Sequence, residues 1–326
     1  MSPPGEYILE VRDLRKHFPI KRGVLKRTVG HVHAVNGVSF RIKKGESLGL
    51  VGESGCGKTT LGKCVVFLQK PTGGEVFFDQ TSLGRLTEAE LRRVRPQFQM
   101  IFQDPYSTLN PRLSVAAMLG EPLMLYEGLN ARQRKERVVE LLTIVGLRPE
   151  HMSRYPHEFS GGQRQRLAVA RALALKPALI ICDEPVSALD VSIQAQVLNL
   201  LDRLKDEFGF SYLFISHDIG VVEHVSDRIA VMYLGQIVEM AADVEICQNP
   251  RHPYTKALMA AIPIPRADAG KRAGNLLKGD VPSPIELPSG CFFHPRCPEA
   301  MDVCRREAPS LKQTAEGREV ACHLFG

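Results

Sequence analysis

Residues 52–59 read Gly-Glu-Ser-Gly-Cys-Gly-Lys-Thr and match the spacing G-x-x-x-x-G-K-[ST]. Glycines at this spacing allow the backbone to wrap closely around phosphate groups, with several N–H groups pointing inward at the start of a helix. Lys58 can then reach the β- and γ-phosphates, and the Thr59 hydroxyl can bind Mg²⁺. The sequence therefore predicts a loop that binds the phosphates of a nucleotide.

Two carboxylates, Asp183 and Glu184, follow directly after an apolar run at residues 179–182. Asp183 stands where a carboxylate can hold Mg²⁺ through water, and Glu184 is placed to polarise the attacking water. Such a pair after a strand usually marks only the start of a helix. Together with the phosphate loop it predicts hydrolysis of the bound nucleotide.

A second stretch suited to an anion is Ser-Gly-Gly-Gln-Arg-Gln-Arg at residues 160–166. A serine and two glycines at a helix N-terminus present N–H donors and a hydroxyl to a phosphate. By itself the pattern is more typical of an ordinary capped helix, so its interpretation depends on the two motifs above.

Short apolar runs precede the first two of these motifs. Residues 47–51 and 178–182 are predicted to be buried parallel strands. Residues 8–11 are predicted to form a short strand that a basic loop follows. The first 33 residues carry seven Lys and Arg against three acidic residues, in a chain of net charge +6. Such a cluster favours a solvated loop, although it could face nucleic acid or anionic lipid.

Amphipathic segments alternate with these runs. Residues 130–145 are predicted to form a helix that Asn130 and Gln133 cap and Gly146 ends. Residues 193–208 predict another helix, with apolar residues on one face. Alternation of strand and helix indicates an α/β protein with a parallel sheet.

Composition sets the class of protein. The 326 residues (36.2 kDa) are 44% hydrophobic and 24% charged, which is typical of globular proteins and excludes general disorder. The length predicts more than one structural unit. No apolar run reaches the ~20 residues of a membrane-spanning helix, and residues 1–6 show no basic and apolar leader, so no secretion signal is expected.

Four of the eight cysteines lie in the last 36 residues, at the spacing C-x5-C-x6-C-x17-C. The prolines after residue 262 predict a small loop-rich extension that needs a staple, and a metal centre is favoured over disulfides. Zn²⁺ is the usual choice, but its ligands come as closer pairs. The wide gaps and the Cys297-Pro298 step favour an iron–sulfur cluster over Zn²⁺, and free thiols are the third alternative. The predicted ligands are Cys291, Cys297, Cys304 and Cys322.

The motifs occur in the order phosphate loop, Gln103, Ser-Gly-Gly-Gln, Asp183-Glu184, Ser-Ala-Leu-Asp ending at Asp190, and His217. In this order, over about residues 7–260, they resemble the ATP-binding subunit of an ABC transporter. The resemblance implies an α/β P-loop ABC ATPase cassette with a RecA-like core, a helical subdomain and a small antiparallel β-subdomain. It also implies ATP and Mg²⁺ as ligands. The implied nucleotide-binding residues are Phe18, Gly52, Glu53, Ser54, Gly55, Cys56, Gly57, Lys58, Thr59, Thr60, Ser160, Gly161, Gly162, Gln163 and Asp190.

The roles of the family carry over to the matching residues. Phe18 resembles the aromatic residue that stacks on adenine, and Gln103 resembles the residue that links Mg²⁺ to the transmembrane partner. Residues 160–163 resemble the signature that covers the ATP held by the opposite subunit. Asp190 resembles the end of a loop between the two sites, and His217 the histidine that contacts the γ-phosphate. The implied catalytic residues are Glu184, His217, Gln103 and Lys58, and the implied Mg²⁺ ligands are Thr59, Gln103 and Asp183.

Two further stretches narrow the resemblance. Asn-Pro-Arg-His-Pro-Tyr-Thr at residues 249–255 and Gly-Cys-Phe-Phe-His-Pro-Arg-Cys-Pro at residues 290–298 are similar to the C-terminal extension of oligopeptide and dipeptide importers. The run at residues 180–196 looks most like the F-type subunit. Tails of this subfamily hold a [4Fe–4S] centre, so the resemblance implies such a cluster, with Zn²⁺ as the alternative.

The resemblance implies an ATPase that dimerises around ATP and powers the import of oligopeptides or dipeptides. Its implied partners are two transmembrane permease subunits, a second ATP-binding subunit (a D-type relative or itself) and, indirectly, an extracytoplasmic solute-binding protein, with no nucleic acid. The cassette would span residues 1–262, with the helical subdomain at about 110–160, and the extension 263–326. The implied location is peripheral, on the cytoplasmic face of the membrane. Import of nickel or another small solute, or a soluble ABC ATPase without transport, are the alternatives.

One cysteine lies inside the phosphate loop. Cys56 precedes the predicted helix at its positive end, where the pKa of a thiol tends to fall. A reactive thiol that ATP protects from alkylation is therefore expected there.

Overall fold

The structure, a computed structural model, describes residues 5–24, 26–261, 279–314 and 317–325. It divides into two compact units. The helical unit consists of Met1–Ile8, Ile42–Glu46 and Arg85–Phe214. The phosphate-loop unit consists of Leu9–Arg41, Ser47–Gly84 and Ile215–Gly326.

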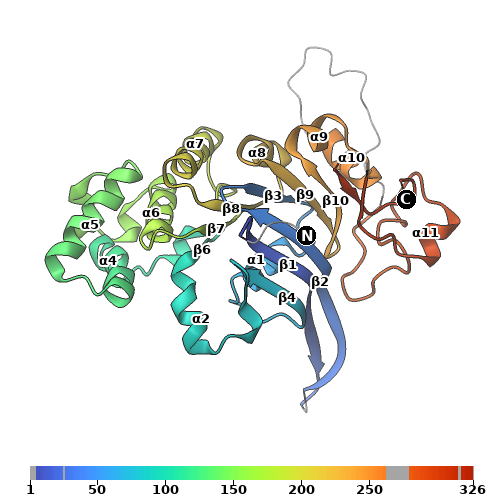
Figure 1. The fold of residues 1–326 in the computed structure, drawn as a ribbon, viewed down its shortest axis with the longest axis horizontal. Helices are drawn as coiled ribbons and strands as arrows, with labels where there is room; N and C mark the ends of the chain where they lie inside the picture. Colours follow the sequence, from blue (N-terminus) through green and yellow to red (C-terminus); the bar gives the residue numbers. More distant parts are fainter. Residues whose placement is uncertain (1–4, 25, 262–278, 315–316, 326) are drawn as a thin grey trace. The chain divides into compact units, whose positions relative to one another are not determined.

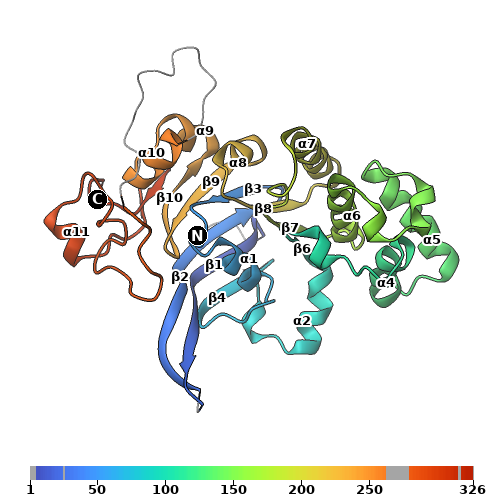
Figure 2. The same ribbon diagram turned by 180° about the vertical axis from the view of Figure 1, so that it is seen from behind.

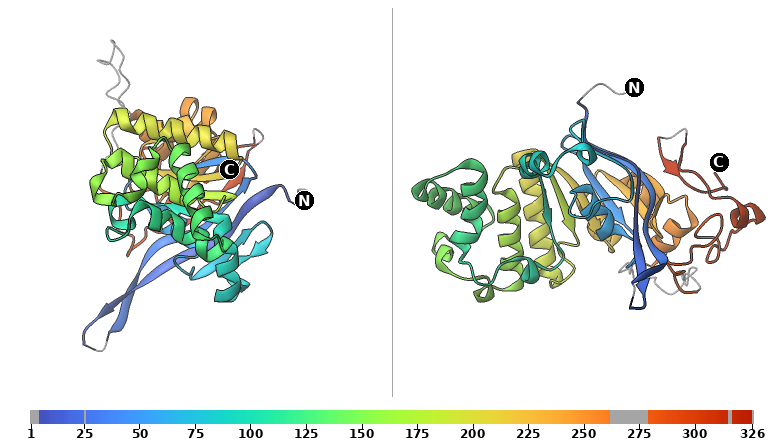
Figure 3. Two further views of the ribbon diagram at one scale, coloured as in Figure 1. Left: turned by 90° about the vertical axis from the view of Figure 1, so that its left-hand side faces the viewer. Right: turned by 90° about the horizontal axis from the view of Figure 1, so that it is seen from below.

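An antiparallel sheet opens the phosphate-loop unit. Its strand order is β2-β1-β4-β5, and β1 and β2 form its long ribbon (Figure 3). On β1, Leu9, Val11 and Leu14 are buried, whereas Arg12 and Arg15 are exposed. The strands are β1 (Tyr7–Arg22), β2 (Arg27–Lys43), β4 (Gly73–Phe78) and β5 (Thr81–Ser82).

The basic segment after residue 11 is strand, so the predicted loop there is wrong. β1 pairs with β4 through Arg12↔Glu75 and, after a register shift, Arg15↔Gly73. The Arg12 guanidinium lies 2.6 Å from the Glu10 carboxylate and 4.5 Å from the centre of the Phe77 ring. Charge therefore occupies the exposed face of a strand whose other face is buried.

A second group of strands in this unit carries the phosphate loop. β3 (Ser47–Val51) is parallel to β9 (Arg228–Tyr233), and β10 (Gln236–Ala242) runs antiparallel to β9. All five residues of β3 are buried, as the apolar run predicted. The group is extended by two short strands, β12 (Glu319–Val320) against β10 and β11 (Lys312–Gln313) against β12.

Helices pack on these strands, with α8 against β3 and α9 against β9 and β10 (Figures 1 and 2). A Cβ atom at Gly49 of β3 would lie 2.0 Å from Cγ1 of Val222 on α8, so the helix requires a glycine beneath it. The helices of this unit are α1 (Lys58–Val65), α8 (Ile219–Val225), α9 (Asp243–Gln248), α10 (Pro253–Ala260) and α11 (Asp302–Arg306).

The helical unit contains two paired parallel strands, β6 (Phe98–Ile101) and β7 (Leu179–Asp183), with α6 against β6. Helices α4, α5 and α6 contact one another, and α6 also contacts α7 (Figure 1). Strand β8 (Ser211–Ser216) contains the boundary between the two units. The helices are α2 (Glu88–Val94), α3 (Pro105–Thr108), α4 (Val115–Glu127), α5 (Ala131–Ile144), α6 (Gly161–Leu173) and α7 (Val191–Phe208). The 3₁₀ turns are η1 (Leu83–Arg85), η2 (Arg95–Gln97), η3 (Pro149–Ser153) and η4 (Pro156–Glu158).

Helix α5 has the predicted caps. The Asn130 side chain accepts hydrogen bonds from the N–H groups of Arg132 and Gln133, and the Gln133 side chain accepts one from the Asn130 N–H. Gly146 follows the helix with φ at 73°. The two predicted buried strands agree with β3 and β7 within one residue.

The described part of the C-terminal tail (residues 279–314 and 317–325) contains few regular elements, as its prolines predicted. β12 attaches it to β10 through Glu239↔Val320 and Met240↔Glu319. The Ala321 N–H continues this attachment with a hydrogen bond of 2.8 Å to the Val238 carbonyl. Among the helices of the described residues, none is long and apolar enough to cross a membrane.

Candidate nucleotide site

The phosphate loop connects β3 to α1. A Cβ atom at Gly52 would lie 2.1 Å from the Met232 carbonyl oxygen, and one at Gly57 would lie 2.0 Å from that of Ala34. Gly57 also has φ at 107°, which other residues rarely adopt. The loop can follow this path only because both positions lack side chains.

Lys58 lies inside the loop. Its side chain is buried, and Nζ donates hydrogen bonds to the carbonyl oxygens of Gly52 (2.7 Å) and Glu53 (3.0 Å). Ser54 and Gly55 are exposed, whereas Thr59 and Thr60 are half-buried in the first turn of α1. The ammonium group and the start of the helix therefore lie together, as an anion site requires.

Glu53 is held by two residues that the sequence analysis missed. Its N–H donates to the Tyr254 hydroxyl at 2.9 Å. Arg296 Nη1 and Nη2 donate to its two carboxylate oxygens at 2.7 and 3.0 Å. Tyr254 and Arg296 belong to stretches that had been noted only for the subfamily they resemble, and no local pattern relates them to residues 52–59.

The expectation for Cys56 is wrong. Its side chain is 3% exposed, and this burial raises the pKa of the thiol. Lys58 Nζ, 3.8 Å from Sγ, acts in the opposite direction, but burial is the larger influence. The side chain is buried within the unit although the loop itself is partly exposed, so the thiol does not gain the reactivity that its position predicted.

In the helical unit, the structure brings together two predicted catalytic residues. Gln103 Nε2 donates to Glu184 Oε2 at 2.9 Å. Glu184 has φ at 47°, in the left-handed region, and its carbonyl accepts hydrogen bonds from the Ser187 N–H and hydroxyl. Such backbone conformations cluster at functional sites. Asp183 is the last residue of β7 and is buried.

The predicted signature begins α6. Ser160 caps the helix: its hydroxyl accepts from the Gln163 N–H, and its own N–H donates to Gln163 Oε1 at 3.1 Å. A Cβ atom at Gly162 would lie 2.5 Å from Cγ2 of Ile193 on α7, so the close packing of two helices requires this glycine. Ser160 and Gly161 are exposed at the helix N-terminus.

The remaining predicted residues lie at element ends or on a strand. Asp190 is exposed at the start of α7 and makes no side-chain cap there. Phe18 is half-buried on β1, with Lys16 Nζ 4.9 Å from the centre of its ring. His217 is exposed and follows β8. His217 and the phosphate loop belong to the phosphate-loop unit, whereas Gln103, Glu184 and the signature belong to the helical unit.

Comparison with known proteins identifies the family of this chain. The family model for the ABC transporter matches residues 35–187, and that for the oligopeptide/dipeptide transporter C-terminal region matches residues 238–304. The oligopeptide transport ATP-binding protein AppF of Bacillus subtilis is 53% identical over 322 residues, which cover 98% of each chain. The chain belongs to the oligopeptide/dipeptide-type ABC transporter ATP-binding proteins.

Other relatives agree. The oligopeptide transport ATP-binding protein OppF of Escherichia coli is 51% identical, covering 94% of this chain and 92% of its own. The dipeptide transport ATP-binding protein DppF of Haemophilus influenzae is 47% identical, covering 97% and 96%. A dimeric post-hydrolysis structure of the ATP-binding cassette MJ0796 bound to ADP and Pi superposes with a TM-score of 0.64 at 31% identity, over 72% of this chain and 98% of the other. The predicted α/β P-loop ABC ATPase fold is confirmed.

The metal centre predicted in the tail of this ABC ATPase is not supported. All four tail cysteines are free, and the Cys291 N–H donates to the Cys304 carbonyl at 2.8 Å. Burial, and to a smaller extent the proximity of the other three cysteines, raises the pKa of Cys297 to about 11. Yet among the described residues no three His, Cys, Asp or Glu side chains converge as ligands of one ion. Tetrahedral Zn–S bonds would require sulfur atoms only about 3.8 Å apart.

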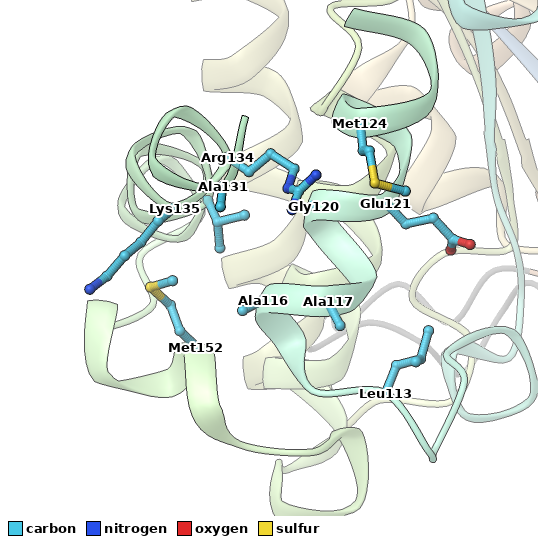
Figure 4. Close-up of a pocket in the computed structure, with 11 residues that line it drawn as sticks. Leu113, Ala116, Ala117, Gly120, Glu121, Met124, Ala131, Arg134, Lys135 and Met152 are labelled. Atoms are coloured by element: carbon cyan, nitrogen blue, oxygen red, sulfur yellow. The ribbon is translucent and has the colours of Figure 1, made fainter. Parts of the chain in front are cut away.

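A groove of about 520 Å³ lies between α4 and α5 of the helical unit (Figure 4). Its lining is mainly apolar and includes Leu113, Met124, Val138 and Met152. Beside it on α4, Leu125 and Tyr126 are also exposed.

Proposed function

We propose that this chain is the ATP-hydrolysing subunit of an importer of oligopeptides or dipeptides. The observation that carries the proposal is the hydrogen bond between Gln103 and Glu184. By resemblance, Gln103 links Mg²⁺ to the transmembrane partner, and Glu184 polarises the attacking water. The hydrogen bond connects these two residues directly. The names of the relatives, which are oligopeptide and dipeptide transport proteins, support the cargo.

By resemblance to the family, each of the predicted site residues has a separate role in hydrolysis. Lys58 and the loop N–H groups bind the phosphates, and His217 contacts the γ-phosphate. Glu184 accepts a proton from the water whose oxygen attacks the γ-phosphorus, while the bond to the β–γ bridging oxygen breaks. Mg²⁺, when bound, would neutralise charge on the phosphate oxygens. Its proposed ligands, Thr59, Asp183 and Gln103, supply the oxygen atoms that Mg²⁺ prefers. The Gln103 nitrogen donates to Glu184, which leaves the amide oxygen as the acceptor suited to a cation.

Dimerisation around ATP follows from the exposed N-terminus of α6. Ser160 and Gly161 present a hydroxyl and N–H groups to solvent, where they can cover an ATP molecule held by a second subunit. The dimeric state of the MJ0796 cassette supports this arrangement. The second subunit is a D-type relative or a second copy of this chain.

The apolar groove between α4 and α5 is the proposed grip on the membrane partner. Each of the two permease subunits would insert a cytoplasmic helix into the groove of one ATP-binding subunit. This contact would place the chain peripherally at the cytoplasmic face of the membrane.

A solute-binding protein would deliver the cargo outside, with no role for nucleic acid. In this scheme residues 1–262 form the cassette, with the helical subdomain at about 110–160, and residues 263–326 form the extension. Nickel or another small solute is the alternative cargo.

Reconstitution tests the transport proposal. The chain, copurified with its permeases and placed in proteoliposomes with the solute-binding protein, should import a labelled tripeptide when ATP is supplied. Glu184→Gln should keep ATP binding and lose hydrolysis by roughly 10²–10⁴-fold, the range for one general base. A variant that hydrolyses ATP at the parent rate, with the partner site disabled, would remove Glu184 from this role. Nickel uptake without peptide uptake would favour the alternative.

Matched variants test the grip on the permease. Met124 of the groove and Val244 of α9 are similarly exposed, at 47% and 51%. Met124→Glu should impair peptide uptake far more than basal ATP hydrolysis, whereas Val244→Glu should affect neither. Equal loss of both activities in Met124→Glu would indicate damage to the fold instead.

The tail proposal is a [4Fe–4S] cluster on the four cysteines, with Zn²⁺ as the alternative. Four free thiols from one short segment support it, since thiolates are the ligands of such clusters. Among the described residues the four side chains do not converge on one ion, so the proposal requires local shifts of these side chains when the metal binds. Anaerobic purification should give about four irons and four labile sulfides per chain. Cys304→Ser should lose them, and Cys247→Ser, outside the tail, should keep them. One zinc per chain would favour the alternative.

A further inference from the structure

Glu53 is the one acidic residue of the phosphate loop. Residues from the C-terminal half of the chain bind both its backbone N–H and its carboxylate. Tyr254 accepts from its N–H, and Arg296, 243 residues away in sequence, binds its carboxylate with two hydrogen bonds. The Arg296 side chain is 6% exposed and that of Glu53 26%. Two-point pairing at a partly buried place fixes geometry as well as charge.

Arg296 lies beside a cluster of four rings, which we call the aromatic anchor: Tyr233, His252, Tyr254 and Phe293. Phe293 is buried, and its ring centre lies 5.3 Å from Tyr233, 5.4 Å from Tyr254 and 5.6 Å from His252. The Arg296 N–H donates to the Phe293 carbonyl at 3.0 Å. Arg296 therefore reaches the loop only while the tail is docked on this anchor.

The charge of Glu53 is unfavourable at this place. A carboxylate within a loop that binds phosphates repels an incoming nucleotide. The Arg296 guanidinium pairs with both carboxylate oxygens and cancels that charge. The hydrogen bond from the Glu53 N–H to the Tyr254 hydroxyl fixes the loop backbone at this residue.

We propose that Arg296 and Tyr254 are positioning residues of the ATP site, so that the affinity for nucleotide depends on a docked C-terminal tail. Arg296 neutralises and holds the Glu53 side chain, and Tyr254 holds its backbone. Neither residue takes part in bond breaking. The inference rests on this loop being the ATP site, which the family assignment supports independently of the cargo.

The test measures binding of a fluorescent ATP analogue to the full chain, together with KM and kcat for ATP. Arg296→Gln should weaken binding and raise KM roughly tenfold, a modest loss for truncating one partner of a hydrogen-bonded charge pair. It should change kcat by less than about twofold, since the hydrolytic groups are untouched. The double variant Arg296→Gln/Glu53→Gln should bind more tightly than Arg296→Gln, because it removes the unpaired carboxylate. A purely structural role of Arg296 would give no such rescue.

Controls separate the possible failures. Arg306→Gln removes one positive charge from the exposed surface of α11 and should bind like the parent chain. Tyr254→Phe removes one hydroxyl from a buried ring, and should weaken binding severalfold even if Arg296→Gln fails to fold. Parent-like affinity in folded Arg296→Gln, or no rescue in the double variant, would overturn the role of Arg296. Parent-like affinity in Tyr254→Phe would overturn that of Tyr254. A parent chain that binds no ATP analogue would instead contradict the proposed function.

Discussion

The phosphate loop takes its shape from backbone contacts, whereas the C-terminal tail is attached mainly by side chains. In the loop, Gly52 and Gly57 approach backbone carbonyls so closely that no Cβ fits, and the Cys56 carbonyl accepts from the Gly235 N–H at 2.9 Å. In the tail, β12 adds only two residue pairs to β10. Two further backbone hydrogen bonds join the tail to its unit, from the Ala321 N–H to Val238 and from the His33 N–H to Pro284. The side-chain anchors include the Arg296–Glu53 pair, the ring of Phe293 and the buried Arg318.

The two regions should therefore fail in different ways. A loop formed by backbone tolerates exchange of its buried side chains but not the addition of a Cβ at its two crowded glycines. A tail held by side chains should detach when one buried charged group is removed, because the removal leaves the opposite charge of its partner buried and unpaired. Their contrast can be tested by pairs of variants within the phosphate-loop unit.

The largest effect is expected from Gly57→Ala. The new Cβ would lie 2.0 Å from the Ala34 carbonyl oxygen, at a φ of 107°. A strained φ and an overpacked contact each cost about 1–3 kcal/mol, and the loop can relieve them only by leaving its phosphate-binding path. Nucleotide binding, measured by titration with a fluorescent ATP analogue, should fall below detection. Gly84→Ala, where a Cβ meets only a ring carbon at 3.7 Å, is the control that should bind normally. Normal binding by Gly57→Ala would contradict a loop shaped by its backbone.

The next effect is expected in the tail, at Arg318. Its side chain is 2% exposed and pairs with Glu239, which is fully buried, at 3.4 Å, and also with Glu245. Arg318→Gln removes the guanidinium partner of the Glu239 carboxylate, which keeps the N–H groups of Arg251 and His252, and breaking such a buried pair costs about 3–5 kcal/mol.

Urea unfolding measures that loss, with Arg306→Gln as the exposed control, expected within about 0.5 kcal/mol of the parent chain. If Arg318→Gln were as stable as Arg306→Gln, side-chain pairing would not be what attaches the tail.

Sequence reasoning succeeded where the physics is local. The motif at residues 52–59 can be recognised from its own spacing, and the Asn130–Gln133 cap of α5 lies within four residues. It failed where distant segments meet. Nothing near Arg296 indicates a partner 243 residues away, and nothing near Cys56 shows that its side chain is buried. The length of β1 was missed because pairing with β4 up to Arg15 and with β2, rather than the composition of β1, keeps its basic half extended.

The attachment of the tail should weaken in acid. Burial, and to a smaller extent the nearby charge of Lys256, lowers the pKa of His252 to about 3. Between pH 6.5 and about 3 the unfolded chain binds a proton at this histidine and the folded chain does not. Stability should therefore be complete above pH 6.5 and fall by about 1.4 kcal/mol per pH unit below it.

His252→Asn separates this effect from other titrating groups. In the parent chain the Tyr254 N–H donates to His252 Nδ1 at 3.0 Å. Asparagine keeps a side-chain acceptor for this N–H but does not titrate. The difference in unfolding free energy between the two proteins should shrink or reverse as the pH falls from 7 to 5. A constant difference would mean that His252 does not resist protonation.

The smallest effect is expected at Cys56, where the loop should tolerate loss of a side chain. Its burial raises the pKa of the thiol, so little thiolate is present at pH 7 and the sulfur is shielded. Iodoacetamide should therefore leave ATP hydrolysis nearly unchanged over a period that fully modifies an exposed peptide thiol, and ATP should add little protection. Cys56→Ala should bind ATP within about threefold of the parent, since the phosphates contact backbone N–H groups rather than this side chain. Rapid inactivation that Cys56→Ala abolishes would show that the loop opens to solvent. Backbone contacts would then not be enough to keep the phosphate loop closed, and the contrast with the tail would fail.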